Sequence, residues 1–297
     1  GAKTVTITGY DMQMSIEKSF ECQSIETGSC IINARIFFDI IRKMRGDEVD
    51  ISVDHDLNAV ISCGRSVFNI KAEDASEFPS LPEVSSKSGI TLPSNTLRSM
   101  INDTIFAIST NENKPVHMGT LFETENGVLS LISVDGYRLA LRKEAVEKKT
   151  GAPSFSFVVP GSALSEVEKI CSGEEDVTVI QGARHIMFQT GDIVLVCRRL
   201  EGEFLAYKNA IPRNNTIKIE GDARTLLQSI ERVSLIISDK LKSPLRCVFG
   251  DGMLSITTKT GIGDAADQCP IDGDGQELEI GFNNKYLMDA LKAAPAE

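Results

Sequence analysis

The sequence predicts an α+β protein built from three copies of one domain, each with two helices packed on antiparallel sheets. Two observations support this fold class. A helix pattern and two strand patterns recur along the chain at a common spacing of roughly 125 residues. In addition, the 297 residues fit two or three ordinary domains of about 100 to 150 residues better than one. A shared internal period therefore indicates repeated domains.

The first recurring element is a short amphipathic helix. Its copies are expected to begin near Asn33, Pro160 and Asn283, residue types that often stand at helix starts. Apolar residues follow each start at spacings of three and four, so each helix should bury one stripe. A second helix type is predicted at 97–105 and again at 226–237. Each repeat would thus contain two helices.

Between the helices, apolar and polar residues alternate as they do in half-buried strands. Equivalent strands are predicted at 5–7, 129–131 and 254–256. Glycine-led segments at 64–78 and 191–204 form a second matching pair. Further strands are expected at 177–180, 185–196, 216–219 and 277–280. Sheet should therefore dominate each repeat.

Composition indicates a globular protein rather than a membrane or secreted one. Apolar residues make up 41% and charged residues 25% of the chain. Its start lacks the pattern of a signal peptide, and no apolar run approaches the roughly 20 residues of a membrane span. The seven scattered cysteines are typical of reduced core thiols. We expect a cytoplasmic protein without a membrane partner.

Patterns for catalysis or metal binding are weak. The three histidines are far apart, so no metal site is expected. The segment 260–266 imitates a dinucleotide-binding loop, but a strand pattern follows it and a hairpin is the better interpretation. The segment 272–275 lacks the carboxylates of a calcium loop and is expected to be a tight turn. No cofactor is expected, although a paired carboxylate site remains open.

Two segments carry a specific resemblance. The run Val-Asp-Gly-Tyr-Arg-Leu-Ala at 134–140, preceded by Leu-Phe-Glu-Thr at 121–124, resembles the signature of the bacterial DNA sliding clamp, the beta subunit of DNA polymerase III. The segment 64–81 resembles the same family. The resemblance implies clamp domains at 1–84, 85–212 and 213–297, with the first lacking its N-terminal part and the third its C-terminal part.

The resemblance further implies a head-to-tail ring dimer that acts as a processivity factor without catalysis of its own. DNA would be contacted by the helix that starts near Asn33 and by the loop 111–116. The DNA-facing candidates are Arg35, Arg42, Lys43, Asn111 and Lys114. Without the resemblance, an ordinary solvated helix face would explain the same charges.

A peptide-binding groove between the second and third domains is also implied by the resemblance. Its expected residues are His117, Val134, Gly136, Tyr137, Arg138, Leu139, Leu205, Asn209 and Ala210. Leu205 and Asn209 stand where relatives often have Pro and Arg, which leaves the peptide preference open. Taken alone, Asp135 and Gly136 would be an ordinary turn between strands.

Ring closure would pair the edge strand 67–70 with the region 236–237 of a second copy. An exposed edge strand with bulky residues is a template for such pairing. The interface candidates are Phe68, Ile70, Ile236 and Ile237. Taken singly, residues of these types are more often part of a core than of an interface.

The partners that follow from the resemblance are duplex DNA without sequence preference, a second copy in a homodimer, the replicative polymerase catalytic subunit, the clamp loader and repair proteins. The net charge of −11 argues against DNA binding unless basic residues are gathered on one face. Two other functions remain open. A repeat scaffold would bind only proteins, and an enzyme with duplicated domains would require a pocket of convergent titratable groups.

Overall fold

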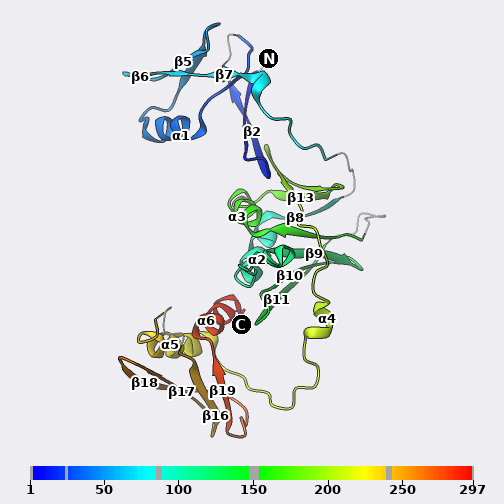
Figure 1. The fold of residues 1–297 in the computed structure, drawn as a ribbon, viewed down its shortest axis with the longest axis vertical. Helices are drawn as coiled ribbons and strands as arrows, with labels where there is room; N and C mark the ends of the chain where they lie inside the picture. Colours follow the sequence, from blue (N-terminus) through cyan, green and yellow to red (C-terminus); the bar gives the residue numbers. More distant parts are fainter. Residues whose placement is uncertain (1–2, 24–25, 85–88, 147–153, 239–242, 296–297) are drawn as a thin grey trace. The chain divides into compact units, whose positions relative to one another are not determined.

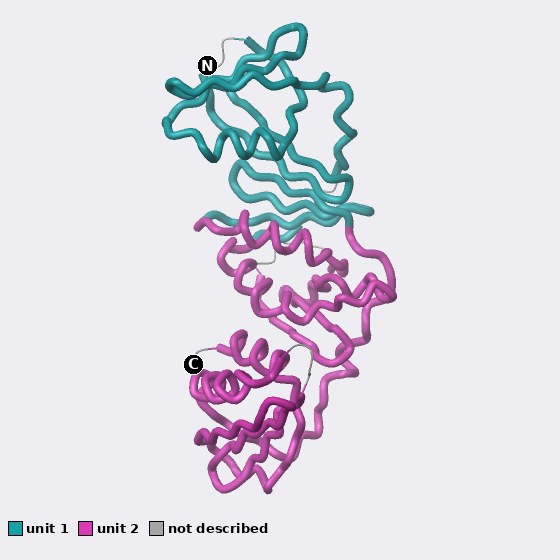
Figure 2. The backbone as a smooth tube through the Cα atoms, turned by 60° about the vertical axis from the view of Figure 1, so that its left-hand side comes forward, with its two compact units in different colours: residues 1–91, 175–198 teal, residues 92–174, 199–297 magenta. Residues whose placement is uncertain are grey.

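The computed structural model describes residues 3–23, 26–84, 89–146, 154–238 and 243–295 (Figure 1). The chain divides into two compact units, which Figure 2 shows in different colours. Unit 1 contains residues 1–91 and 175–198, and unit 2 contains residues 92–174 and 199–297. Residue 85, the predicted start of the second domain, lies outside the described residues.

A six-stranded sheet organises unit 1. In spatial order, the strands are β1 (Lys3–Tyr10), β2 (Met14–Cys22), β15 (Ile193–Arg198), β14 (His185–Thr190), β13 (Asp176–Gln181) and β8 (Gly89–Pro93). From β1 to β13, each strand is antiparallel to the next one in this order. Strand β15 pairs with β2 with Leu195 opposite Ile16, so segments far apart in the sequence share one sheet.

Helix α1 (Ala34–Lys43) of unit 1 begins where the sequence predicts. The side-chain oxygen of Asn33 accepts a hydrogen bond from the backbone N–H of Ile36 at 3.1 Å and caps the helix. The other elements of the unit are β3 (Cys30–Ile31), β4 (Asp50–Val53), β5 (Asn58–Cys63), β6 (Ser66–Lys71), β7 (Glu73–Asp74) and the 3-10 helix η1 (Ala75–Glu77). Strands β4, β5 and β6 form an antiparallel sheet, with β6 at its edge as predicted.

Unit 2 contains one arrangement twice. It has two four-stranded sheets with the same strand order, in which the third, second, first and fourth strands along the chain lie side by side. One helix precedes each set of strands in the chain and another follows it, which confirms the predicted repeat with two helices per copy. In both copies the first helix packs against the sheet of its own copy, because an amphipathic helix buries its apolar stripe against another element.

The first copy in unit 2 consists of α2 (Ser94–Ile105), β9 (Gly119–Glu125), β10 (Val128–Val134), β11 (Leu139–Ala145), β12 (Ser156–Pro160) and α3 (Gly161–Ile170). The second consists of α5 (Ala223–Ser234), β16 (Leu245–Gly250), β17 (Met253–Thr260), β18 (Gly263–Pro270), β19 (Leu278–Phe282) and α6 (Asn284–Ala293). Two short helices, η2 (Pro115–His117) and α4 (Tyr207–Ala210), complete the unit. The predicted helix starts at Pro160 and Asn283 are confirmed.

Cores lie where helices cover these sheets. In the second copy, Ile230 and Val233 of α5 are buried against Leu254 and Ile256 of β17. In the first, the rings of Phe122 and Phe157 stack with centroids 5.5 Å apart. Five of the seven cysteines are buried and all seven are free thiols, in agreement with the interpretation as reduced thiols. Within the described part of the chain, no helix is long and apolar enough to span a membrane.

Three details of the sequence prediction are wrong. Residues 216–219 form no strand, and only the neighbouring Glu220 makes a single bridge, to Asp272. The stretch 185–196 is two strands, because the chain turns at Gly191, where φ is +51°. Helix α5 ends at Ser234, so Ile237 lies beyond it. Alternation alone does not distinguish a strand from an extended linker, which explains the first error.

Candidate functional site

The turn between β10 and β11 is built by one carboxylate. Oδ1 of Asp135 accepts hydrogen bonds from the backbone N–H groups of Tyr137 at 2.9 Å and Arg138 at 3.1 Å. Gly136 has a φ of +94°, a conformation that residues with a side chain rarely adopt. The turn leaves Tyr137 85% exposed, whereas Leu139 is half-buried. The predicted turn is therefore confirmed, and it presents a large aromatic ring to solvent.

Below this turn lies an apolar cluster shared by several strands. Val134 at the end of β10 is 2% exposed and packs with Leu121 of β9 and Val158 of β12. Tyr207 of α4 is 5% exposed and joins the same cluster. The partly buried residues packed against it are Leu139, Leu141, Leu200 and Phe204. The segment that follows Leu200 is thus attached to the sheet by side-chain packing.

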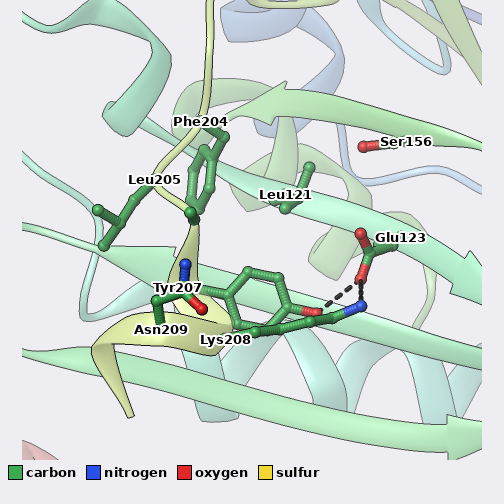
Figure 3. Close-up of a pocket in the computed structure, with 9 residues that line it drawn as sticks. Leu121, Glu123, Ser156, Phe204, Leu205, Tyr207, Lys208 and Asn209 are labelled. Atoms are coloured by element: carbon green, nitrogen blue, oxygen red, sulfur yellow. Dashed lines mark hydrogen bonds and ion pairs between the residues drawn. The ribbon is translucent and has the colours of Figure 1, made fainter.

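An open pocket lies where this segment meets β9 and β12 (Figure 3). Strand β9 contributes Leu121 and Glu123, which lie on one face because they are two residues apart. Strand β12 contributes Ser156. The remaining lining is a continuous stretch, Phe204, Leu205, Ala206, Tyr207, Lys208 and Asn209. Its lining therefore combines apolar side chains, such as Leu121 and Phe204, with polar ones, such as Glu123 and Lys208.

Charged and polar groups gather along one side of this pocket. The Tyr207 hydroxyl donates a hydrogen bond to Oε2 of Glu123 at 2.6 Å, and Nζ of Lys208 lies 3.5 Å from the same oxygen (Figure 3). Burial, together with the Glu123 carboxylate, raises the pKa of Tyr207 to about 12. Lys208 also donates to Glu125 at 2.9 Å, a hydrogen bond that raises the pKa of the lysine. These contacts fix α4 to β9.

His117 lies at the end of η2, against the ring of Phe204. The two ring centroids are 5.2 Å apart in an edge-on arrangement. Burial, and then the nearby cation of Lys114, lowers the pKa of His117. Its Nε2 atom is buried and has no hydrogen-bond partner among the described residues. Burial and the positive charge of Lys114 therefore both favour the neutral imidazole of His117.

The structure brings most of the predicted groove residues to this region of unit 2. Leu205 and Asn209 line the pocket, Val134 and Leu139 belong to the apolar cluster, and His117 touches Phe204. Gly136, Tyr137 and Arg138 form the turn, and Ala210 ends α4. Sequence reasoning missed Phe204, Tyr207, Lys208 and Glu123. No local pattern connects Glu123 with a tyrosine 84 residues later.

The predicted DNA-facing residues are all exposed. On α1 of unit 1, Arg42 lies 3.6 Å from Asp39, and its guanidinium lies 5.4 Å from the ring centroid of Phe38. In unit 2, the side-chain oxygen of Asn111 accepts a hydrogen bond from the backbone N–H of Asn113 and shapes the loop before η2. Lys114 precedes that 3-10 helix.

The predicted interface residues differ in exposure. Phe68 on the edge strand β6 is 39% exposed, whereas Ile70 is half-buried. Ile236 and Ile237 are half-buried after the end of α5, and Ile237 packs against the core of its own domain. The neighbouring Leu235, which sequence reasoning did not select, is 84% exposed.

Comparison with known families matches three successive segments of the chain to three domains of one protein family. The N-terminal domain of the DNA polymerase III beta subunit matches residues 2–82. The central domain of the same subunit matches residues 91–205, and its C-terminal domain matches residues 208–297. The three domains follow one another along the chain in the order that the sequence resemblance implies.

Individual relatives agree. A beta sliding clamp of Halalkalibacterium halodurans is 33% identical over 99% of this chain and 80% of its own length. The crystal structure of a DNA polymerase III beta subunit from Eubacterium rectale, 32% identical, has a TM-score of 0.92 over 99% of this chain and 80% of that one. A sliding clamp of Bartonella birtlesii bound to griselimycin is 26% identical, with a TM-score of 0.90 over 98% and 80% of the two chains. This chain belongs to the bacterial sliding-clamp family, the beta subunits of DNA polymerase III.

Proposed function

We propose that this chain is a DNA polymerase processivity factor, a subunit of a ring that encircles duplex DNA and tethers the replicative polymerase. The observation that carries the proposal is the match of three successive segments to the three domains of one clamp subunit. In this role the ring holds DNA by topology, and the chemistry of synthesis belongs to the polymerase. We propose the domain boundaries 1–84, 85–212 and 213–297 for its three parts, and a cytoplasmic location.

Retention on circular DNA tests the ring directly. The protein is loaded by a clamp loader onto nicked circular DNA, the salt concentration is raised to a level that removes ordinary phosphate binders, and half of the sample is linearised. Retention on circles with release from linear ends is expected of a ring. Equal loss from both forms, despite a positive control clamp that loads, would favour a surface binder or a protein scaffold instead.

The proposed DNA-facing residues make a separate prediction. Arg35 and Arg42 are exposed on α1, so reversing both charges (Arg35→Glu with Arg42→Glu) should weaken low-salt binding of duplex DNA. Each lost phosphate contact should reduce the slope of log affinity against log salt by about one. Arg184→Glu with Arg198→Glu is the matched control, because both arginines are exposed in the same unit but outside the candidate set. If the control variant weakened DNA binding equally, the loss would reflect the overall charge of the protein and not contacts made by α1.

We propose that the pocket beside α4 and the adjoining turn form the groove that binds short apolar peptides of the polymerase, the clamp loader and repair proteins. Its apolar cluster, exposed Leu205 and exposed Tyr137 support this assignment. Griselimycin is a suitable probe, because a family member binds it. Leu205→Glu introduces a charge that a bound ligand would desolvate, so the affinity should fall by tenfold or more, equivalent to about 1.4 kcal/mol.

A matched control distinguishes the groove from general surface damage. Ile262→Glu introduces the same charge at a residue that is 76% exposed on the β17–β18 hairpin of unit 2. It should leave griselimycin binding unchanged in isothermal titration calorimetry. Equal affinities for the wild type and the Leu205 variant would place the ligand elsewhere.

We further propose that the ring is a homodimer closed by β6 on one side and by the region of Ile236 and Ile237 on the other. The exposed ring of Phe68 on an edge strand supports this interface. Phe68→Asp should therefore shift the sedimentation coefficient from dimer to monomer. Phe38→Asp, at a 60% exposed residue of α1, is the control and should leave the dimer intact. A monomeric wild type would refute the proposal for this chain.

A further inference from the structure

One arginine of the groove region is engaged on both sides of a domain boundary inside unit 2. Nε of Arg138 donates a hydrogen bond to Oδ2 of Asp135 at 2.9 Å, within the same turn. Nη1 donates to Oδ2 of Asp289 on α6 at 2.7 Å, and Nη2 donates to the backbone carbonyl of Phe106, just after α2. The guanidinium therefore links the central domain to a helix of the C-terminal domain.

Two aromatic rings complete its surroundings. The guanidinium carbon lies 4.2 Å from the ring centroid of Tyr286 on α6 and 5.2 Å from that of Phe106. Tyr286 and Asp289 are three residues apart on α6, so they lie on one face of the helix. Arginine is suited to this position because its planar group can stack on rings while donating hydrogen bonds in its own plane.

Burial makes these contacts stronger than surface ion pairs. The side chains of Arg138, Asp135 and Asp289 are 16%, 11% and 23% exposed. Partly desolvated charges are weakly screened, and removal of the arginine would leave two carboxylates without their shared cation. Three nitrogens of Arg138 are already engaged within the chain, which favours a structural role over a role as a free donor to a bound peptide.

The same turn leads directly into the groove. Leu139 follows Arg138 and packs against the apolar cluster that contains Val134 and Tyr207. A shift of α6 relative to the turn would therefore move Leu139, which packs against the cluster that contains the pocket residues Leu121 and Tyr207. Such a route is a contiguous set of packed side chains, which is the physical basis for coupling between sites.

We infer that Arg138 is a positioning residue: with Asp289 and Tyr286 it forms a joint that fixes α6 against the 135–138 turn and thereby sets the affinity of the groove. The part of this inference that concerns affinity rests on the proposed groove function. The joint itself concerns only contacts within the chain. Asp289 and Tyr286 lie outside the predicted groove residues, so an effect of Asp289 on ligand binding would act through Arg138.

A double-mutant cycle with Arg138→Gln and Asp289→Asn tests both parts, using urea unfolding midpoints and griselimycin affinity. Each single variant should lower the midpoint, and the double variant should lower it by less than the sum of the two shifts. Each single variant should weaken griselimycin binding by about tenfold, and the double variant also by about tenfold rather than the roughly hundredfold of independent residues. The conservative variant Arg138→Lys should have nearly the same midpoint and griselimycin affinity as Arg138→Gln, since lysine lacks the planar fork of donors.

Arg142→Gln is the matched control. Arg142 lies on the same strand β11, but its acidic partners Asp103 and Glu144 both belong to the central domain. Its midpoint shift should add to that of Asp289→Asn. Additive shifts for Arg138 and Asp289 would overturn the joint, and unchanged affinity in Asp289→Asn would overturn its influence on the groove. A wild type that binds no griselimycin would instead refute the groove assignment, and the midpoints alone would then decide the joint.

Discussion

Replacing Tyr207 by Phe removes one hydroxyl and leaves the ring in place, so it isolates the hydrogen bond that holds α4 against β9. The hydroxyl donates to Glu123 at 2.6 Å, and the residue is 5% exposed. Hydrogen bonds to charged groups contribute about 1.5 to 3 kcal/mol. Because the Glu123 side chain is 25% exposed and keeps Lys208 at 3.5 Å, the lower end applies, and Tyr207→Phe should cost about 1.5 kcal/mol.

Tyr207→Ala provides the comparison. It also removes the ring from the apolar cluster, and loss of a buried aromatic side chain costs about 3 to 5 kcal/mol. Urea unfolding followed by circular dichroism measures both variants. A Phe variant with the stability of the wild type, or one as unstable as the Ala variant, would refute the division between hydrogen bond and packing.

The raised pKa of Tyr207 adds a signature in pH. Its pKa is about 12 in the folded chain and about 10 in an unfolded one. A group whose pKa is raised by folding contributes stability that is complete below the unfolded pKa and is lost as pH rises through the folded pKa. The difference in unfolding free energy between wild type and Tyr207→Phe should therefore be constant below about pH 10 and shrink toward about pH 12. A difference that grows over this range would contradict the proposed hydrogen bond.

Three further predictions concern the fold. Gly119→Ala would place a Cβ 2.2 Å from a backbone oxygen of β12, so we expect a loss of about 2 kcal/mol or more in urea unfolding. Gly9→Ala, whose Cβ meets nothing within 4 Å, is its control. Asn283→Ala removes the N-cap of α6 and should cost about 1 kcal/mol by the same measurement. Iodoacetamide applied to the native chain at neutral pH should label, by mass spectrometry, the two half-buried thiols first, those of Cys22 and Cys30; earlier labelling of a buried thiol would contradict the core packing.

Features that depend on local sequence were predictable. The helix starts at Asn33 and Asn283 follow from capping, because each side chain accepts a hydrogen bond from an amide three residues later. The repeat was visible for the same reason, since each copy preserves the same local patterns. The structure of residues 216–219 was not predictable, because an extended linker and a strand share the same alternation of apolar and polar residues. Only a neighbouring strand in the folded chain distinguishes the two.

Features of the candidate site that depend on distant partners were not predictable from the residues alone. Family resemblance predicts Arg138 as a groove residue, but it gives no sign of the link to Asp289, which spans 151 positions. The sequence does not single out Tyr207, which anchors α4, because nothing around it indicates Glu123 as its partner. Such pairs are set by how separate layers pack, and neither residue alone specifies the other.

The acidic composition of the chain is compatible with the proposed DNA contact once charge is considered locally. The chain carries 42 acidic against 31 basic residues, yet helix α1 has three cations, Arg35, Arg42 and Lys43, and one carboxylate, Asp39. A ring that holds DNA by topology needs only weak, exchangeable phosphate contacts on its inner side. Strong binding would oppose sliding, so an excess of negative charge elsewhere limits nonspecific attachment without preventing retention. On this reasoning, raising the salt concentration should abolish direct binding to open duplex DNA while leaving a loaded ring on circular DNA.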